Sequence, residues 1–256
     1  MKVTYIDHMG DDLSVVNAAR VSFGKRSQWD ITDVLSEADR GLIGFLARGC
    51  TSGDWESLKD DVIGGPAEVV DHSELERVFN HIRKMPPHWS PFAHTAVTLH
   101  LKMPIFVARQ IMKHTTGIVY NEVSRRYVDS EPEFYVPDVW RKRADNVKQG
   151  SSDEAVDSKS LTWTCPEDEM EGVYQKSLDA YRELIYYCDV APEQARMILP
   201  QSMYTEVIAT GNLYAFANMY NQRTDSHAQK ETQEIAKQLG EIIEPLYPES
   251  WKALTQ

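Results

Sequence analysis

The sequence predicts an α+β fold, because strand-like and helix-like stretches alternate along its 256 residues without an internal repeat. Residues 95–103, TAVTLHLKM, alternate polar and apolar side chains with the period of a half-buried strand. Residues 37–48 space their apolar side chains as an amphipathic helix does. With 42% hydrophobic residues the chain can bury a large core, so we expect a single domain over residues 1–256.

The first half is expected to begin with a strand at 3–6 and a helix at 12–19 that Asp11 or Asp12 caps. Helices at 37–48 and 73–84 precede the strand at 95–103. A helix over 104–115, PIFVARQIMKHT, follows directly, because proline is well tolerated at a helix start. A Thr-Thr-Gly loop then leads to an extended segment at 121–127, NEVSRRY.

The second half is expected to contain one strand, at 203–209. Its helices are expected at 171–188, 192–197, 213–220 and 227–243. Ser226 and Gln229 have the spacing of a capping box for the last of these helices. An Asp225–His227 catalytic pair is an alternative reading, which we disfavour because capping already accounts for Asp225 and Ser226.

The net charge of −12 comes from two segments. Residues 52–79 hold eight acidic and two basic residues, and residues 151–171 hold seven and one. We expect both to be acidic surface insertions, with loop or weakly ordered chain at 64–68 and 151–160. Such a surface argues against binding nucleic acid. The short basic stretch 140–148, WRKRADNVK, could suggest a nucleic-acid-binding module, which we disfavour because the patch is short and joins an acidic segment.

No run of about 18 apolar residues exists, and the start MKVTYIDHMGDD lacks the features of a signal peptide, so we expect a cytoplasmic protein without membrane contact. Cys50, Cys165 and Cys188 show no disulfide or metal spacing and no activating base nearby. Histidines at 88, 94 and 100 recur every six residues, which is not a zinc spacing. We therefore expect no metal and no cysteine nucleophile.

Ionisable side chains concentrate between residues 109 and 127. On a helix, residues four apart share a face, so the pairs 109/113 and 110/114 gather polar heads along one edge near its end. In an extended 121–127 segment, Glu122, Ser124 and Arg126 would share one face. Such a cluster can hold a small anion through bidentate arginine contacts. The alternatives are a solvated helix face and a salt-bridged strand face.

Several ordered motifs carry a resemblance to a known family. These are AARVSF at 18–23, HWSPFAH at 88–94, PIFVARQ at 104–110, NEVSRRY at 121–127, Arg196 with Pro200, and RTDSHAQ at 223–229. In this order the chain resembles the flavin-dependent thymidylate synthases over most of its length, outside the two acidic segments and part of 24–36. The resemblance implies a central, mostly antiparallel sheet flanked by helices, and a homotetramer with active sites between subunits.

The resemblance also implies an enzyme that methylates dUMP to dTMP, with methylenetetrahydrofolate as carbon donor and NADPH-reduced FAD as hydride carrier. The residues implied for dUMP are Gln110, Lys113, Glu122, Ser124, Arg125, Arg126, Arg196 and Arg223. Those implied as catalytic are Arg223, Ser124 and His114. Those implied for FAD are Ser22, His88, Ser90, Lys113, His114, Asn212 and Asn218. Ser22 and Ser90 could instead be turn or cap hydroxyls, and Asn212 a helix N-cap.

The chain departs from the family pattern near the flavin. Lys113-His114-Thr115 stands where the family has Arg-His-Arg, and one extra residue precedes Ser124. Ala93, Arg125 and Tyr214 stand where the family commonly has Glu, a small residue and Arg. Because Lys lacks the planar fork of Arg and Thr carries no charge, we expect a remodelled flavin site. A related hydroxymethylase acting on the same class of nucleotide, and a nucleotide-binding protein without catalysis, remain as alternatives.

Overall fold

The computed structural model describes residues 1–49, 87–145, 150–157 and 165–255. The chain divides into two compact units. Unit 1 comprises Met1–Ile6, Thr98–Thr210 and Met219–Leu239, and unit 2 comprises Asp7–Val97, Gly211–Asn218 and Gly240–Gln256. The helix expected at 73–84, the acidic segment 52–79 and Cys50 lie outside the described residues.

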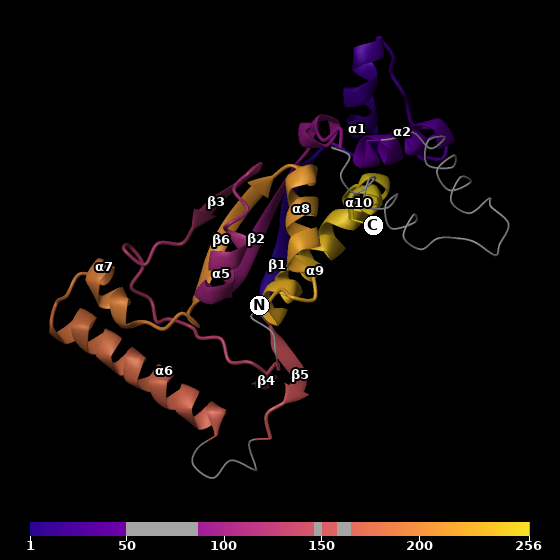
Figure 1. Ribbon diagram of the computed structural model, residues 1–256. Helices are drawn as coiled ribbons and strands as arrows, with labels where there is room; N and C mark the ends of the chain where they lie inside the picture. Colours follow the sequence, from indigo (N-terminus) through magenta and orange to yellow (C-terminus); the bar gives the residue numbers. More distant parts are fainter. Residues whose placement is uncertain (50–86, 146–149, 158–164, 256) are drawn as a thin grey trace, which may run out of the picture. The chain divides into compact units, whose positions relative to one another are not determined.

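A four-stranded antiparallel sheet forms the frame of unit 1 (Figure 1), which confirms the mostly antiparallel sheet that the family resemblance implies. Its strand order is β1 (Lys2–Met9), β2 (Ala96–Pro104), β6 (Tyr204–Gly211) and β3 (Ile118–Glu122). The first two strands are therefore adjacent both in sequence order and in space, whereas β6 enters between β2 and β3.

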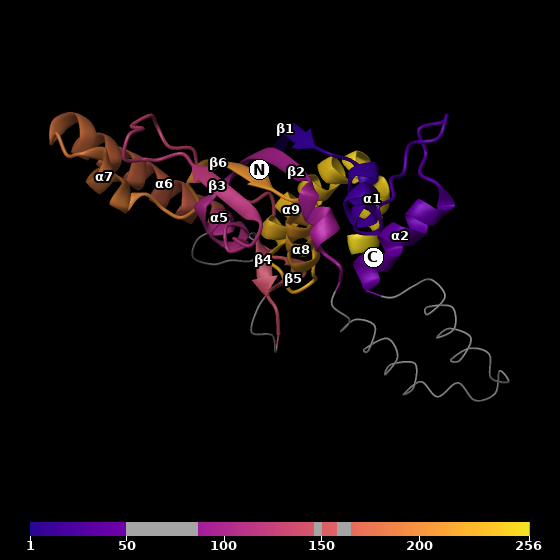
Figure 2. The ribbon, with the colours of Figure 1, turned by 90° about the horizontal axis from the view of Figure 1, so that it is seen from above.

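One face of this sheet is apolar and lies against helices. Leu99, Leu101 and Met103 of β2 are fully buried, as the alternation in the sequence predicts. Figure 2 shows α5 (Ile105–Ile111) and α9 (Lys230–Ile243) on one side of the sheet. Both helices bury apolar side chains, among them Val107, Ile111, Ile235 and Leu239. The expected arrangement of a sheet with flanking helices is thus confirmed.

The other face of the sheet carries polar pairs. The hydroxyls of Thr98 and Thr210 lie 3.0 Å apart, and His100 Nε2 lies 2.8 Å from Glu206 Oε2. Both pairs join β2 to β6, where opposite residues of antiparallel strands bring their side chains close. They are partly exposed, so we expect them to set the strand register more than to add stability.

The helix expected at 104–115 is shorter, because α5 ends at Ile111. Pro104 is its N-cap residue, and the N–H of Met112 closes the last turn on the Ala108 carbonyl at 2.8 Å. Gly117 then adopts a left-handed φ of 77°, which turns the chain into β3. The loop between them therefore contains Lys113, His114 and Thr115.

The acidic segment 151–171 is partly regular, which corrects the expectation of a loop at 151–160. Residues Ser151–Ala155 form β5, which pairs with β4 (Arg141–Arg143) in a separate antiparallel sheet. Opposite charges make this pairing favourable, since Lys142 Nζ lies 2.9 Å from Glu154 Oε2. Helix α6 (Pro166–Arg182) begins five residues before expected, because Pro166 at its start and the acidic first turn suit a helix N-terminus.

After α6, a π-helical turn (Glu183–Tyr187), α7 (Pro192–Ala195) and the 3-10 turn η5 (Arg196–Ile198) lead to β6. The sequence expectation of a short helix at 192–197 agrees with the last two. Cys188 lies at the end of the π-helical turn and is exposed.

Unit 2 is built from helices. Within the described residues they are α1 (Asp12–Arg20), η1 (Val21–Phe23), α2 (Glu37–Arg48), η2 (Ser90–His94), the start of α8 (Leu213–Arg223), the end of α9, η6 (Glu244–Leu246) and α10 (Pro248–Thr255). Asp11 caps α1 as expected, with its carboxylate accepting from Ser14 N at 2.7 Å. Helix α10 was not expected. It docks on α1 through the buried Asp12 carboxylate, which accepts from the backbone N–H groups of Glu249 and Ser250 at 2.8 and 2.9 Å.

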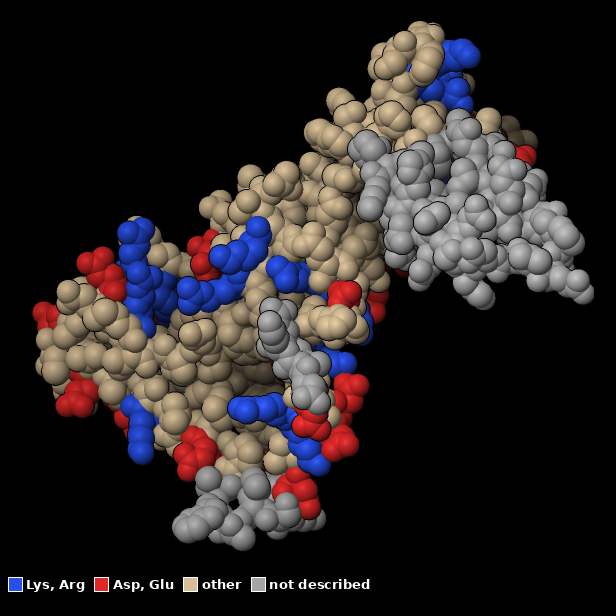
Figure 3. Space-filling model, in the orientation of Figure 1, with Lys and Arg blue, Asp and Glu red and all other residues tan. Residues whose placement is uncertain are grey.

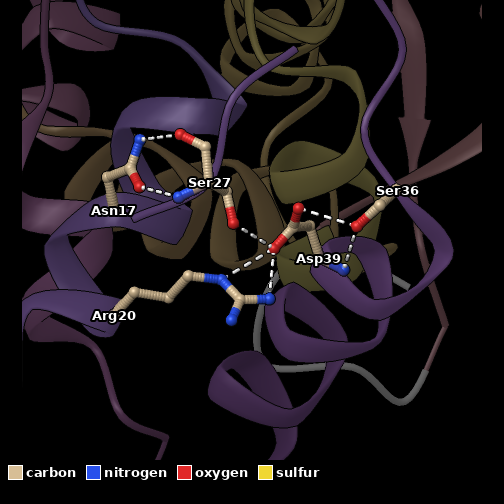
Figure 4. Close-up of polar contacts among 5 residues, drawn as sticks. All are labelled: Asn17, Arg20, Ser27, Ser36 and Asp39. Carbon is tan, nitrogen blue, oxygen red and sulfur yellow. Dashed lines mark hydrogen bonds and ion pairs between the residues drawn. The ribbon is translucent and has the colours of Figure 1, made fainter. Parts of the chain in front are cut away.

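A polar cluster links α1, α2 and the loop between them (Figure 4). Asp39 is almost fully buried and accepts hydrogen bonds from Arg20 Nε at 2.8 Å, Ser27 Oγ at 2.8 Å and Ser36 Oγ at 2.7 Å. Asn17 fixes Ser27 by two further bonds to its backbone. Burial opposes ionisation, but the bonds from Ser36 and Ser27 and the Arg20 charge hold the pKa of Asp39 below its ordinary value.

Candidate functional site

A cavity of about 810 Å³ in unit 1, called here the first cavity, gathers most of the side chains expected to bind dUMP. Helix α5 and the residues after it form one wall, the segment after β3 a second, and η5 with the start of β6 a third. Its polar lining consists of Arg109, Lys113, Glu122, Ser124, Arg125, Arg126, Arg196 and Thr205. Its apolar lining includes Ile105, Met112, Met197, Leu199 and Met203.

The first cavity is strongly basic. Five of its lining side chains are Lys or Arg, and the only acidic one is Glu122. Figure 3 shows Lys and Arg gathered on this face, over the positions of α5 and α7. None of the five cations forms an ion pair with a carboxylate in the described part of the chain. Cations that lack internal partners around a hollow attract an anionic ligand.

The segment expected to be extended at 121–127 is a strand only to Glu122, and the rest forms a turn. The N–H of Val123 makes the last bond to β6, at Glu206 O, and the N–H groups of Tyr127 and Val128 return to Ser124 O at 3.0 and 3.2 Å. Beyond this point residues 133–135 pair with β6 instead, since Tyr204 N donates to Glu133 O at 2.8 Å.

This turn changes which residues act together. A strand would have pointed Arg125 away from Ser124 and Arg126. In the turn, residues 122–126 all line the first cavity. Glu122 is held by the Thr205 hydroxyl, which donates to Oε1 at 2.7 Å. The guanidinium of Arg126 donates to the Tyr127 hydroxyl at 2.7 Å and lies 5.0 Å from that ring.

A second cavity of about 530 Å³ holds the remaining two residues expected to bind dUMP, Gln110 and Arg223. Its other lining residues are Arg141, Gly150, Ser151, His227, Ala228 and Gln229. It shares no lining residue with the first cavity. The pairs 109/113 and 110/114 therefore do not gather along one edge of α5, because Arg109 and Lys113 face the first cavity and Gln110 the second.

Arg223 is held by hydrogen bonds to the last turn of α5 and to the loop that follows it. Its Nε donates to His114 Nε2 at 2.9 Å, and its Nη2 donates to the Gln110 carbonyl at 3.0 Å. Burial, and then the Arg223 charge, lowers the pKa of His114, so the imidazole accepts this bond in its neutral form. Of the three residues implied as catalytic, Arg223 and His114 are in contact, whereas Ser124 lines the first cavity.

The residues expected to bind FAD fall in both units. Lys113 and His114 belong to unit 1, and Ser22, His88, Ser90, Asn212 and Asn218 belong to unit 2. All of these unit 2 side chains except Asn212 are exposed. Asn212 is the N-cap of α8, with Oδ1 accepting from Ala215 N at 2.9 Å, as the capping alternative predicts.

Asp225 and His227 are in contact, but both side chains are exposed to solvent. His227 Nδ1 and backbone N lie 2.9 and 2.8 Å from Asp225 Oδ1. Helix α9 begins at Lys230, so the expected capping box of Ser226 with Gln229 is wrong. The Gln229 carbonyl instead accepts from the N–H groups of Thr232 and Gln233 at 2.9 Å. The residues from 225 to 229 form a turn at the rim of the second cavity.

Sequence reasoning missed several cavity residues. Arg109 was recognised by its spacing from Lys113, but it was given no role. Arg141, Ser151 and Gln229 of the second cavity come from segments far apart in the chain, so no local pattern could have joined them. The thiol of Cys165 has a raised pKa because Asp168 accepts its hydrogen bond, which does not suit a nucleophile.

Two further observations concern the described residues. They contain no group of three or more His, Cys, Asp or Glu side chains placed to hold a metal ion. Nor does any of their helices have the length and apolar character needed to cross a membrane.

The chain is similar to known proteins along nearly all of its length. Residues 4–249 match the family model Thy1, described as thymidylate synthase complementing protein. Flavin-dependent thymidylate synthases from Pseudothermotoga lettingae and Thermosipho africanus are 33% and 34% identical over 251 residues. These matches cover 98% and 97% of this chain and 88% of each relative.

A solved structure shares the fold. The crystal structure of the UMP/dUMP methylase PolB from Streptomyces cacaoi, bound with 5-Br UMP, superimposes with a TM-score of 0.71. The match covers 99% of this chain and 93% of PolB at 26% identity.

Proposed function

Because the chain belongs to the thymidylate synthase complementing protein family, we propose that it is a flavin-dependent thymidylate synthase. The reaction is the reductive methylation of dUMP to dTMP, with methylenetetrahydrofolate as carbon donor and NADPH as reductant. The observation that carries this proposal is the first cavity, where five Lys and Arg side chains that form no ion pair within the described residues lie around Glu122 and Ser124. A nucleoside monophosphate has both the anion and the hydrogen-bonding groups that such a lining suits.

Side chains on different walls of the first cavity can bind different parts of dUMP. Arg126 and Arg196 present planar guanidinium forks, which suit the bidentate geometry of a phosphate. Ser124 can donate or accept, and Glu122, oriented by Thr205, can accept from a sugar hydroxyl or a ring N–H. Arg125 adds a charge where the family has a small residue, so we expect tighter phosphate binding than in the usual site.

The second cavity would act on the pyrimidine. Arg223 is held at two points, by His114 and the Gln110 carbonyl, so its remaining N–H groups are oriented in advance. A guanidinium fixed in this way stabilises negative charge that develops on a pyrimidine carbonyl during methyl transfer. Because His114 is neutral, it leaves the full positive charge on Arg223.

The two cavities share no lining residue, so the residues expected to bind dUMP fall into two groups within one chain. We propose that the second cavity of one copy completes the first cavity of another, in a homotetramer. A closed symmetric assembly allows every copy to give and receive such a contribution. Subunit-shared sites would explain why residues that must act on one nucleotide lie in separate cavities here.

The donor set fits FAD in its chemistry. Lys113 supplies a cation for a phosphate, and the exposed side chains of Ser22, His88, Ser90 and Asn218 supply hydrogen-bonding groups. Asn212 still has its amide N–H groups to donate, since only its Oδ1 serves the cap. When bound, FAD supplies the hydride. The protein's own groups position the nucleotide and exclude water, and we propose that they do so in the cytoplasm.

The experiment is an absorbance spectrum of the purified protein with added FAD, followed by NADPH, methylenetetrahydrofolate and dUMP. The proposal expects a flavin spectrum that bleaches with NADPH and a product with the mass of dTMP. A hydroxymethylated nucleotide would replace the proposed reaction by the related hydroxymethylase. Protein that binds dUMP but never binds flavin would refute the redox function.

A further inference from the structure

The second cavity contains a second arginine, Arg141, to which the sequence gave no role. Arg141 begins β4, whereas Arg223 ends α8, and both residues belong to unit 1. Both line the second cavity, and none of the described residues that line it is acidic. Two guanidinium groups therefore meet at one hollow without a carboxylate on its wall.

Arg141 is held rigidly from behind. Its Nε donates to Ser151 Oγ at 2.7 Å, across the β4–β5 hairpin, and its Nη2 donates to Glu231 Oε1 at 2.7 Å. The side chain of Glu231 is 7% exposed, so solvent screens this ion pair little. Arg223 is held through the same two atoms, Nε and Nη2. Both guanidinium groups are thus oriented before any ligand binds.

Each of the two arginines keeps its third nitrogen, Nη1, available. Neither Nη1 has a hydrogen-bond partner among the described residues. Neither is one of the buried, unpartnered polar atoms in the described part of the chain, and the side chain of Arg141 is 23% exposed. A ligand in the second cavity can therefore reach an N–H group of both arginines.

A pair of fixed cationic donors suits a ligand with two acceptors and no opposing donor at the same positions. The two ring carbonyls of uracil only accept hydrogen bonds, and guanidinium N–H groups only donate. We propose that Arg141 is a second residue that binds the uracil base, so that Arg141 and Arg223 donate to its two carbonyls. This inference rests on the proposed function, in which the second cavity receives the pyrimidine of dUMP.

The same arrangement makes the site selective for uracil over cytosine. Cytosine has an amino group in place of one carbonyl, and that amino group cannot accept a bond from a guanidinium. One of the two fixed donors would then face another donor and lose its bond to water, which disfavours dCMP. Arg141 is therefore a specificity-determining residue in this account, and Glu231 and Ser151 are its positioning residues.

A purely structural role for Arg141 would be to attach the hairpin to α9. That role uses only Nε and Nη2, so it does not account for the accessible Nη1. The attachment also has a second ion pair, between Lys230 Nζ and Asp153 Oδ1 at 2.9 Å. Because the hairpin is tied at two points, substitutions can separate its attachment from base binding.

The test measures equilibrium binding to the full-length protein in the presence of FAD by calorimetry. Its probes are dUMP and deoxyribose 5-phosphate, which is the same nucleotide without the base. Arg141→Gln removes a charge-assisted bond to the base, so it should raise the dUMP Kd by about tenfold or more. The Kd of deoxyribose 5-phosphate should not change, because the first cavity binds the phosphate.

Arg141→Lys separates base binding from hairpin attachment. Lysine keeps a cation for Glu231, so the hairpin stays tied, but it lacks the planar fork that reaches the base at the same time. The dUMP Kd should therefore rise in Arg141→Lys nearly as much as in Arg141→Gln. Thermal unfolding should show that Arg141→Lys restores any stability that Arg141→Gln loses.

Matched controls come from the same hairpin. Arg143→Gln removes an exposed cation of β4 that does not line the second cavity, and it should leave the dUMP Kd unchanged. Asp153→Asn breaks the other ion pair to α9 and should also leave it unchanged. Arg126→Ala in the first cavity should instead weaken both probes. The wild type should bind dUMP at least about tenfold more tightly than dCMP.

Each outcome supports or overturns the assignment. A loss confined to dUMP in both Arg141 variants supports it, even if the protein makes no dTMP, in which case only the proposed reaction fails. Active protein whose KM and Kd for dUMP ignore Arg141→Gln refutes it and leaves the reaction standing. Full recovery of dUMP binding in Arg141→Lys, or equal loss for both probes, would mean that Arg141 only attaches the hairpin. Equal wild-type affinities for dUMP and dCMP would also refute the paired carbonyl contacts.

Discussion

The division of the dUMP residues between two cavities predicts that two different inactive variants should rescue each other. Arg126→Ala removes a guanidinium from the first cavity, and Arg223→Ala removes one from the second. If each active site takes its first cavity from one copy and its second from another, each homo-oligomeric variant has a defect in every site. Each alone should lose at least about a hundredfold in kcat/KM, because Arg126→Ala removes a charge-assisted contact to the phosphate and Arg223→Ala removes a group that stabilises transition-state charge.

The expected rescue follows from random assembly. In an equal mixture, a site is intact only when the Arg223→Ala protein supplies its first cavity and the Arg126→Ala protein its second. Each choice has a probability of one half, so about one quarter of the sites in closed symmetric oligomers should be intact. Activity should therefore recover to about one quarter of the wild-type rate, far above either variant alone.

The assay is dTMP formation by the two variants produced separately, then by the same proteins after co-expression in equal amounts. Arg196→Ala provides the matched control, because Arg196 lines the same cavity as Arg126. Co-expressing Arg126→Ala with Arg196→Ala should give no recovery, whereas Arg196→Ala with Arg223→Ala should recover as the first mixture does. If the first mixture stays as inactive as its components, the two cavities act within one copy and the shared site is wrong.

Three further outcomes are expected. Arg20→Leu should lower the free energy of unfolding by about 3 kcal/mol, the lower end for breaking a buried ion pair, because Asp39 stays buried while Arg20 is partly exposed. Chemical denaturation should show a smaller loss at pH 3, where Asp39 can take a proton, and an equal loss at both pH values would contradict this. Because the pKa of His114 is lowered in the native state, below about pH 6.5 its imidazole binds a proton more readily in the unfolded chain than in the folded protein. The stability of the wild type should thus fall as the pH drops from 6.5, and fall less in His114→Gln; parallel curves would show that His114 titrates normally. Lys113→Arg should tighten FAD binding several-fold by restoring a planar fork, measured by flavin fluorescence titration, and an unchanged Kd would mean that Lys113 does not hold the flavin.

The sequence was sufficient to predict an element where the residues of that element themselves include its capping residues and a periodic apolar face. Helix α2 has the expected bounds, because Ser36 caps it, Gly49 ends it with a left-handed φ of 73°, and its apolar spacing buries Ile43 and Leu46. Strand β2 likewise follows from alternation alone. In these segments local propensity and tertiary packing favour the same structure.

Local signals failed where a segment depends on a distant partner. NEVSRRY has the alternation of a strand, but the β6 edge beyond Glu206 is taken by residues 133–135, so the chain turns at Ser124. The acidic stretch 151–155 resembles a loop, yet the basic strand at 141–143 gives it an oppositely charged partner. In both cases hydrogen bonds to another strand outweigh the local pattern.

The sequence by itself determined the family, the mixed helix and strand architecture, and the types of residue expected to bind a phosphate. Motifs and hydrophobic periodicity can be recognised within short stretches of sequence, without knowledge of the tertiary structure. Only the tertiary structure decided which of those residues act together. It placed Gln110 and Arg223 in a different cavity from Ser124 and Arg126. It also buried Glu231 with an Oε2 that has no hydrogen-bond partner among the described residues. Burial and unmet hydrogen bonds depend on what the rest of the chain brings near a residue, and neighbours in sequence do not specify that.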